Sequence, residues 1–193
     1  MKLYLIRHGI SLGNQKKVYN GRLDEKLSQE GIKDLEEKKS LYTNLKVDYC
    51  YCSTLTRARQ SWAILFPKLA VNEYRDDLVE MDFGDWTGMS YQDKFKELLA
   101  QGYSYNDLID PDNGESYEQL FERTTNFLNE VLTKHHDSNC IVVLTHGLVI
   151  SSLMYQHFVI GKSMYELAPA NGLGFIIEFD EHKQLKDVKK IAL

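Results

Sequence analysis

The chain has 193 residues, of which 43% are hydrophobic and 26% are charged, and this composition predicts one globular domain over residues 1–193. Its formal net charge of -5 argues against nucleic acid as the main partner, because binding a phosphate backbone requires a broad basic face. No apolar run approaches the ~20 residues of a membrane span. The N-terminus leads directly into an apolar run without the pattern of a signal peptide. We therefore expect a cytoplasmic protein that binds no membrane.

Short apolar runs alternate with longer amphipathic runs, which is the pattern of an α/β protein. Strands are predicted over residues 2–6, 47–52, 71–74, 140–144, 174–179 and 188–193. Helices are predicted from Ser28 to about Tyr42, from Ser53 or Thr54 to about Pro67, from Ser90 to about Ala100, from Ser116 onward, and over about 148–158. The residues from about Glu80 to Gly114 are less regular, and we expect them to form a small cap inserted over one edge of the sheet.

Two of these elements carry clear signals. Ser116 and Gln119 form a capping-box pattern, and apolar residues follow them at helical spacing, which predicts a helix with one face in the core. The run over 140–144 contains no charged residue, as expected of a central parallel strand that is covered on both faces.

Two histidines follow apolar runs in the same way. Arg7-His8-Gly9 follows the first predicted strand, and Thr145-His146-Gly147 follows the strand over 140–144. If these strands are neighbours in one parallel sheet, both imidazoles lie at its carboxyl edge, where open α/β sheets bind ligands. His8 is then a candidate nucleophile for phosphoryl transfer, and His146 would donate to phosphoryl oxygens. The glycine after each histidine would let phosphate approach the backbone N–H groups.

Arginine is the side chain best suited to hold a phosphoryl group, because its planar guanidinium matches phosphate oxygens. Arg7 ends the first predicted strand, and Arg57 lies about one turn into the helix that follows the second strand. Both could therefore converge on one ligand at the sheet edge. Arg59 is two residues further along and should point elsewhere, because positions i and i+2 do not share a helix face.

Hydrolysis also needs a proton donor for the leaving alkoxide and a base for water. Glu80, Asp82 and Asp85 lie within one short segment, among Met, Phe and Trp residues. Apolar surroundings favour the protonated form of a carboxyl group. The spacing of the three residues does not choose among them.

In combination, these segments resemble the histidine phosphatase superfamily, in its phosphoglycerate-mutase-like branch. The matching segments are Arg7-His8-Gly9 with Ser11 and Asn14, Ser53-x-Leu-x-Arg57-Ala58, Glu80 before Phe83-Gly84-x-Trp86-x-Gly88, Gly114-Glu115-Ser116 and Thr145-His146-Gly147. They occur in the family's order over about residues 2–180. The resemblance implies a three-layer α/β/α sandwich with a mostly parallel central sheet. Ile10 stands where members often carry Glu or Gln, which affects contacts at the pocket mouth rather than the phosphate pocket.

The resemblance also implies the roles of the site residues. His8 becomes phosphorylated, and Glu80 is the proton donor, which the spacing alone did not decide. The phosphoryl group is held by Arg7, Arg57 and His146. The phosphate pocket is also lined by Asn14, Ser11, Gly9 and Gly147. This branch of the family needs no metal, and we expect no cofactor for this chain.

A phosphatase and a mutase make different demands on the residues after Glu80. Mutases of this family hold a second phosphate and a carboxylate, largely with cations from an insertion after that glutamate. Between Arg75 and Arg123 this chain has only Lys94 and Lys96 as basic residues. We therefore favour a metal-independent hydrolase of small-molecule phosphate esters, in which water discharges phospho-His8. A cofactor-dependent phosphoglycerate mutase is the alternative.

The substrate is open between two types of phosphatase. The segment over 80–88 and the segment over 111–116 are similar to those of α-ribazole-phosphate phosphatases of bacterial cobalamin synthesis, and also to those of broad-specificity phosphatases. The expected cap carries aromatic residues that could stack on a ring or pack the cap itself, namely Tyr91, Phe95, Tyr103 and Tyr105.

Two interpretations from other classes remain. His8, His146 and a carboxylate could bind Zn²⁺, in which case chelation would abolish activity, but Arg7 and Arg57 would repel a cation. A binding module that recognises phosphate without catalysis would bind a phosphorylated ligand without turnover. The sequence does not indicate an oligomeric state.

Overall fold

The computed structural model describes residues 1–104, 106–137 and 139–192. In this part of the chain a six-stranded sheet has the strand order β3-β2-β4-β1-β5-β6. The strands are β1 (Lys2–Arg7), β2 (Tyr49–Ser53), β3 (Glu73–Arg75), β4 (Cys140–Thr145), β5 (Gly174–Phe179) and β6 (Leu185–Lys190). The first four pair in parallel, whereas β5 is antiparallel to both of its neighbours. The prediction of a mostly parallel sheet is therefore confirmed.

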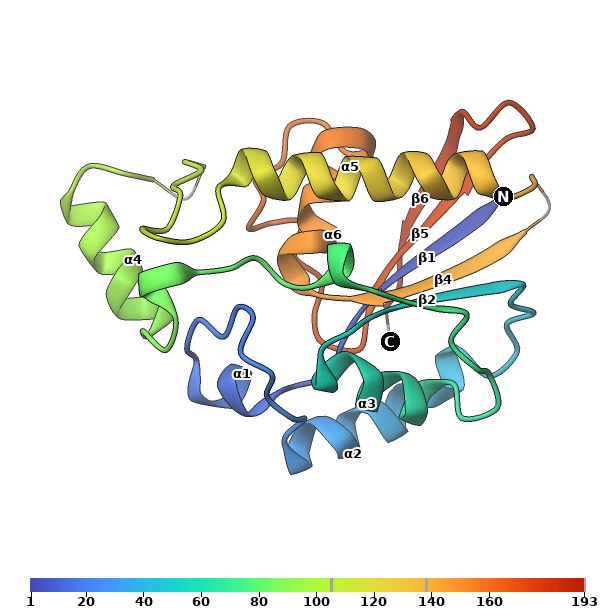
Figure 1. Cartoon of the computed structure of the whole chain (residues 1–193), viewed down its shortest axis with the longest axis horizontal. Helices are drawn as coiled ribbons and strands as arrows, with labels where there is room; N and C mark the ends of the chain where they lie inside the picture. The colour runs from blue at the N-terminus through green and yellow to red at the C-terminus, as the bar shows by residue number, and fades with distance from the viewer. Residues whose placement is uncertain (105, 138, 193) are drawn as a thin grey trace.

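Helices cover both faces of this sheet (Figure 1). α2 (Gln29–Lys38) and α3 (Thr56–Leu65) lie on one face, and α5 (Tyr117–Lys134) and α6 (Gly147–Leu153) lie on the other. The buried apolar side chains form two clusters, one with the inward faces of α2 and α3 and one with those of α5 and α6. This layering confirms the predicted three-layer α/β/α sandwich.

Hydroxyl side chains set the starts of several helices. Ser28 Oγ accepts from the backbone N–H of Gly31 at 3.0 Å and caps α2. At the start of α5, Ser116 Oγ accepts from Gln119 N at 3.1 Å, and the Gln119 side chain accepts from Ser116 N at 2.9 Å. This reciprocal pair is the predicted capping box, and it satisfies two N–H groups that a helix start leaves unpaired.

The pairing of β1 with β4 brings the two histidines together. The register aligns Arg7 with Thr145 across the two strands. The next residue of each strand is a histidine. Because the two strands are parallel, His8 and His146 leave the same edge of the sheet side by side, as the sequence predicts.

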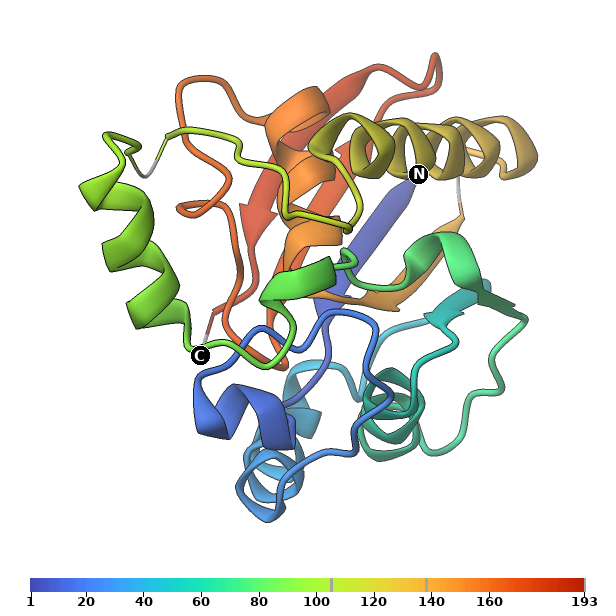
Figure 2. The same cartoon turned by 60° about the vertical axis from the view of Figure 1, so that its left-hand side comes forward.

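The segment over 80–114 stands beyond this carboxyl edge, next to the short helix α1 (Leu12–Lys16) (Figure 2). It contains α4 (Tyr91–Ala100), and the backbone N–H of Tyr91 donates to the carbonyl of Lys17 at 3.1 Å. The interpretation of this segment as a cap stays a prediction. Across all described helices, none combines the length and apolar character that crossing a membrane requires.

Several predicted boundaries are wrong, since the strands expected over 47–52 and 71–74 are Tyr49–Ser53 and Glu73–Arg75. The last strand is Leu185–Lys190 rather than 188–193, and Leu193 lies outside the described residues. This strand is at the sheet edge and mostly exposed, so its lysines leave no apolar signal of the kind that marks inner strands. α3 starts after Leu55 rather than at Ser53 or Thr54, because Ser53 still belongs to β2.

Candidate active site

His8 follows β1, and its backbone N–H donates to the carbonyl of Thr145 at 2.9 Å. The ring nitrogen Nδ1 lies 2.6 Å from the carbonyl oxygen of Gly9. Since a carbonyl oxygen only accepts, Nδ1 carries the hydrogen of the neutral ring. Nε2 therefore carries the lone pair of the ring, and this lone pair accepts from Arg57 Nε at 3.3 Å. The nitrogen that could act as a nucleophile is the one that faces Arg57.

His146 lies beside His8, with the two ring centroids 4.9 Å apart. It caps α6 at its N-terminus, and its Nε2 lies 2.8 Å from Ser53 Oγ at the end of β2. Its Nδ1 is buried and has no partner among the described residues. A buried polar atom without a partner is uncommon, which marks this atom as a candidate ligand contact.

Burial and the neighbouring cations keep both imidazoles neutral. Burial, followed by the charges of Arg57 and Arg7, lowers the pKa of His8 well below its ordinary value of 6.5. Burial and Arg57 also lower the pKa of His146 well below that value. Both rings are therefore uncharged near neutral pH, as a nitrogen nucleophile requires.

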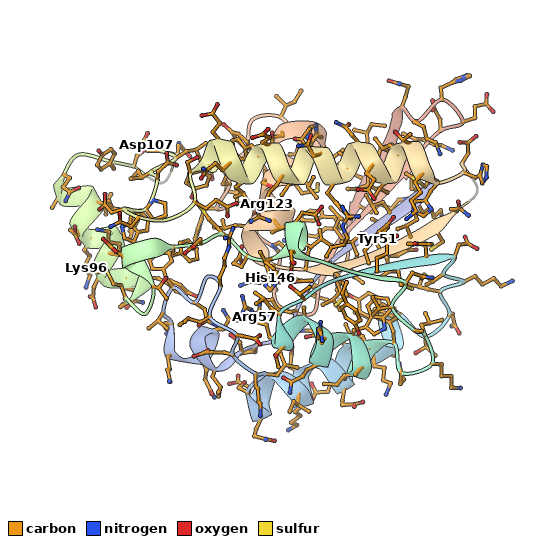
Figure 3. All side chains as sticks on the ribbon, viewed as in Figure 1. Tyr51, Arg57, Lys96, Asp107, Arg123 and His146 are labelled. Atoms are coloured by element: carbon orange, nitrogen blue, oxygen red, sulfur yellow. The ribbon has the colours of Figure 1, made fainter. Side chains whose placement is uncertain are left out.

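Arg57 is almost completely buried, with 1% of its surface exposed. Its Nη1 donates to the carbonyl of Leu23 and its Nη2 to the carbonyl of Gly21, each at 2.7 Å. These two bonds and the contact with His8 use all three guanidinium nitrogens, which fixes the plane of the group. Figure 3 shows Arg57 and His146 together at the centre of the molecule.

Arg7 is oriented by the backbone in a similar way. Its Nη1 donates to the carbonyl of Pro169 at 2.8 Å, and burial lowers its pKa while the charge of Glu80 opposes that shift. Gly147 leaves room for this side chain, because a Cβ there would make a tight contact of 3.3 Å with Cζ and Nε of Arg7. Arg59 points away from the site, as predicted, with its Cζ 4.4 Å from the ring centroid of Tyr74.

The structure gives Gly9 and Ser11 other contacts than those predicted, and neither is among the described residues that line the cavity at this edge. The N–H of Gly9 donates to Ser61 Oγ at 2.9 Å. A Cβ on Gly9 would lie 2.5 Å from Leu35 Cδ1, so helix packing rather than phosphate access requires this glycine. Ser11 Oγ accepts from Asn14 N at 3.2 Å and caps α1.

Asn14 lines the cavity, and a residue that the sequence did not indicate supports it. Asn171 Nδ2 lies 3.3 Å from Asn14 Oδ1 and 3.0 Å from the carbonyl of His8. Asn171 therefore links the end of β1 to α1. Ser53, which contacts His146, was also missed as a site residue. Neither contact has a local sequence signal, because each joins residues that are more than 90 positions apart.

Geometry separates the three candidate carboxylates. Glu80 lines the cavity, with Oε1 accepting from Met81 N at 3.0 Å and Oε2 from Leu148 N at 3.4 Å. Asp82 Oδ1 accepts from Gly84 N at 3.0 Å, and Asp85 Oδ2 accepts from Asn113 Nδ2 at 2.9 Å. Those two carboxylates stabilise turns, and neither is among the described lining residues.

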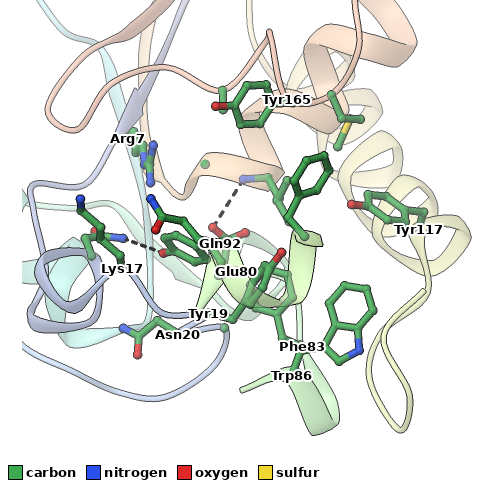
Figure 4. Close-up of a pocket in the computed structure, with 18 of the residues that line it drawn as sticks. Arg7, Lys17, Tyr19, Asn20, Glu80, Phe83, Trp86, Gln92, Tyr117 and Tyr165 are labelled. Carbon is green, nitrogen blue, oxygen red and sulfur yellow. Dashed lines mark hydrogen bonds between the residues drawn. The ribbon is translucent and has the colours of Figure 1, made fainter. Parts of the chain in front are cut away.

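The cavity has a volume of about 670 Å³ and is lined by two groups of side chains. One group consists of Arg7, His8, Arg57 and Glu80, and we call this part of the cavity the phosphate end. His146 contacts His8 but is not among the described lining residues. Aromatic side chains form much of the remaining wall, which we call the aromatic end (Figure 4). They are Tyr19, Phe83, Trp86, Tyr91, Phe95, Tyr117 and Tyr165. Of the aromatic residues that the sequence singled out, Tyr91 and Phe95 line the cavity, Tyr103 does not, and Tyr105 lies outside the described residues.

These features define a class of α/β protein in which arginine and histidine side chains gather at the carboxyl edge of the parallel strands. Residues 3–189 match the family model of the histidine phosphatase superfamily (branch 1), and the chain belongs to this superfamily. The predicted resemblance, and the prediction of an enzyme of this family, are therefore confirmed.

Curated relatives and solved structures agree with this assignment. The chain is 31% identical over 159 residues to the adenosylcobalamin/α-ribazole phosphatase of Escherichia coli, covering 80% of this chain and 77% of that protein. It is 32% identical over 159 residues to phosphoglycerate mutase-like protein 4 of Arabidopsis thaliana, covering 79% of this chain and 69% of that protein. The crystal structure of the α-ribazole phosphatase from Shigella flexneri matches with a TM-score of 0.80 and 28% identity, over 99% of this chain and 96% of that chain.

Proposed function

We propose that this protein hydrolyses small phosphate monoesters through a phosphohistidine at His8, without a metal ion. The observation that carries the proposal is the environment of His8. Its Nδ1 bonds to a carbonyl, and the lone pair of its Nε2 accepts a hydrogen bond from Arg57 Nε at 3.3 Å. A neutral imidazole nitrogen can attack phosphorus as the nucleophile, and the fixed guanidinium beside it can stabilise the charge on the phosphoryl oxygens.

The reaction proceeds in two steps, formation of the phosphohistidine and its hydrolysis. His8 Nε2 attacks phosphorus, a P–N bond forms, the ester P–O bond breaks, and the leaving oxygen takes a proton from the Glu80 carboxyl group. Glu80, now a carboxylate, then accepts a proton from water, whose oxygen attacks phosphorus as the P–N bond breaks. Inorganic phosphate leaves, and His8 is neutral again. Arg7, Arg57 and Nδ1 of His146 stabilise the charge on the phosphoryl oxygens in both steps.

The wall beyond the phosphate end supports a substrate with an apolar or aromatic alcohol part. Aromatic side chains bind flat rings by stacking, and each contact of this kind adds ~0.5–1.5 kcal/mol. Relatives named α-ribazole phosphatases support α-ribazole phosphate as the first candidate. Hydrolysis is favoured over the mutase reaction because neither Lys94 nor Lys96 is among the described residues that line the cavity, which leaves Lys17 as the one lysine among them.

The test is phosphate release in the presence of EDTA, with His8→Ala beside the wild-type protein. The panel contains p-nitrophenyl phosphate, glycerol phosphate, phosphoglycerate and α-ribazole phosphate. We expect metal-independent turnover of the wild type, loss of turnover in the variant, and the highest kcat/KM for an ester with a ring. Turnover that survives in His8→Ala, or is abolished by EDTA, contradicts the proposal. Phosphoryl transfer within phosphoglycerate without phosphate release would identify a mutase instead.

A further inference from the structure

The backbone that carries Glu80 is held by an ion-pair cluster around a buried carboxylate that the proposed chemistry does not use. Glu115 belongs to the Gly114-Glu115-Ser116 segment, and only 6% of its side chain is exposed. Arg123 on α5 and Arg22 from the loop after α1 both bond to its carboxylate. We call Glu115, Arg22 and Arg123 the Glu115 clamp.

The clamp contacts the chain before Glu80 through Arg123. Arg123 Nε and Nη2 donate to the two carboxylate oxygens of Glu115 at 2.5 and 2.9 Å. The remaining nitrogen, Nη1, donates to the carbonyl of Asp77 at 2.7 Å. The same guanidinium therefore binds Glu115 with two bonds and fixes the backbone three residues before Glu80. A two-bond pair of this kind has a defined geometry that a lysine would not give.

The clamp also contacts Glu80 itself and the chain after it. Arg22 Nε lies 3.5 Å from the carbonyl oxygen of Glu80, and Arg22 Nη2 lies 3.3 Å from Glu115 Oε2. Glu115 Oε2 accepts from the N–H of Asp82 at 3.3 Å, and Glu115 N donates to the carbonyl of Asp82 at 2.9 Å. The segment from Asp77 to Asp82 is therefore fixed before, at and after Glu80.

The close approach of the two loops depends on the glycines of the matched segments. A Cβ on Gly114 would lie 2.6 Å from the carbonyl oxygen of Asp82. Gly84 has φ of +46°, and a Cβ there would lie 2.2 Å from the carbonyl oxygen of Asp112. Both contacts would exclude a larger residue. The segments around Glu80 and Glu115 thus pack directly together, with the carboxylate of Glu115 at their junction.

We propose that Glu115 is a positioning residue for Glu80: it sets the place of the proton donor through Asp82, Arg22 and Arg123 without contacting the substrate. The inference rests on the proposed function, in which Glu80 protonates the leaving oxygen. A general acid acts only within hydrogen-bond reach of the atom it protonates, so a small displacement of this segment lowers the rate for esters that need the proton. Esters with a good leaving group need it much less.

The experiment measures kcat and KM for glycerol phosphate and for p-nitrophenyl phosphate in three variants. Glu115→Gln removes the negative charge of the clamp. Arg22→Gln removes its half-exposed arginine, which is the milder change. Glu130→Gln is the matched control, because Glu130 on α5 also accepts two bonds from one arginine, Arg75, at 2.8 Å each. Glu80→Gln gives the scale, and the melting temperature of each variant shows that it is folded at the assay temperature.

We expect Glu115→Gln to lower the ratio of the two kcat values, alkyl over aryl, about tenfold, as part of the ~10²-fold that loss of a general acid costs. Arg22→Gln should lower the ratio in the same direction, and Glu130→Gln should leave it unchanged. The inference is overturned if Glu115→Gln and Arg22→Gln leave the ratio unchanged, whether both kcat values fall equally or neither falls. If the wild type releases phosphate from no ester of the panel given above, the proposed function fails, and the inference fails with it.

Discussion

The two ends of the cavity are built by different means. At the phosphate end, backbone carbonyls fix the cationic side chains: Pro169 holds Arg7, and Gly21 and Leu23 hold Arg57. At the other end, aromatic rings pack on one another, as Tyr19 does on Phe83 with centroids 4.7 Å apart. Hydrogen bonds to backbone have strict geometry, whereas apolar packing adapts to modest changes of shape.

This difference has a consequence for mutation. A buried charge costs free energy unless it is hydrogen-bonded, so a change at the phosphate end disturbs the backbone hydrogen bonds that hold Arg7 and Arg57. At the aromatic end, a change at the exposed Tyr165 removes contact area from the bound ester, whereas Phe83 and Trp86 also belong to the buried core. Substitutions at the phosphate end should therefore lower kcat, and substitutions at the aromatic end should raise KM.

The largest effect is expected for Arg57→Lys. Lysine keeps the charge but loses the planar group that contacts Gly21, Leu23 and His8 at once. We expect kcat to fall by ~10²-fold or more. Arg59→Lys, two residues further along α3, is the matched control and should keep wild-type kcat. Steady-state kinetics on p-nitrophenyl phosphate measure both variants, and a similar kcat for the two would remove Arg57 from the proposed mechanism.

Glu80→Gln should have the next largest effect, and the effect should depend on the ester. Turnover of glycerol phosphate should fall by ~10²-fold, because its alkoxide needs a proton to leave, while p-nitrophenyl phosphate should lose far less. Asp85→Asn is the control, since Asp85 bonds to Asn113 outside the cavity. Equal losses for the two esters in Glu80→Gln would point to a different proton donor.

Much of the phosphate end could be predicted from sequence because it follows from regular structure. Parallel pairing of two strands places His8 and His146 together, and the helical period separates Arg57 from Arg59. Both depend on local patterns that the chain displays. The start of α5 was predictable for the same reason, since both halves of its capping box lie within four residues.

The remaining parts depend on contacts between distant segments. The spacing of Glu80, Asp82 and Asp85 could not show that only the first faces the cavity, because loop packing decides it. The packing of Gly9 against Leu35 depends on how α2 crosses the end of β1, which no pattern around residue 9 encodes. Asn171 and Arg22 act across the fold in the same way, so each is visible only in three dimensions.

A smaller effect is expected at the aromatic end. Tyr165 lines the cavity and is 72% exposed, so Tyr165→Leu should not disturb folding. We expect KM for an aromatic phosphate ester to rise about fivefold, as the loss of one aromatic contact implies, with kcat unchanged. Tyr155→Leu is the control, because Tyr155 stacks on Phe121 and is not among the described lining residues. A fall in kcat with constant KM would contradict the division between the two ends.

The smallest expected effect is a change in how stability depends on pH. The folded protein lowers the pKa of His8 below its ordinary value of 6.5, mainly by burial and then by Arg57. Below that value the unfolded chain binds more protons than the folded one, so the free energy of unfolding falls as the pH falls. The stabilisation is complete above the unfolded pKa and is lost on acidification. His8→Asn should therefore lose fewer degrees of Tm than the wild type between about pH 7.5 and about pH 5.5. His182→Asn, which removes an exposed ring, should keep the wild-type fall, and an equal fall in His8→Asn would show that His8 is not held neutral by the fold.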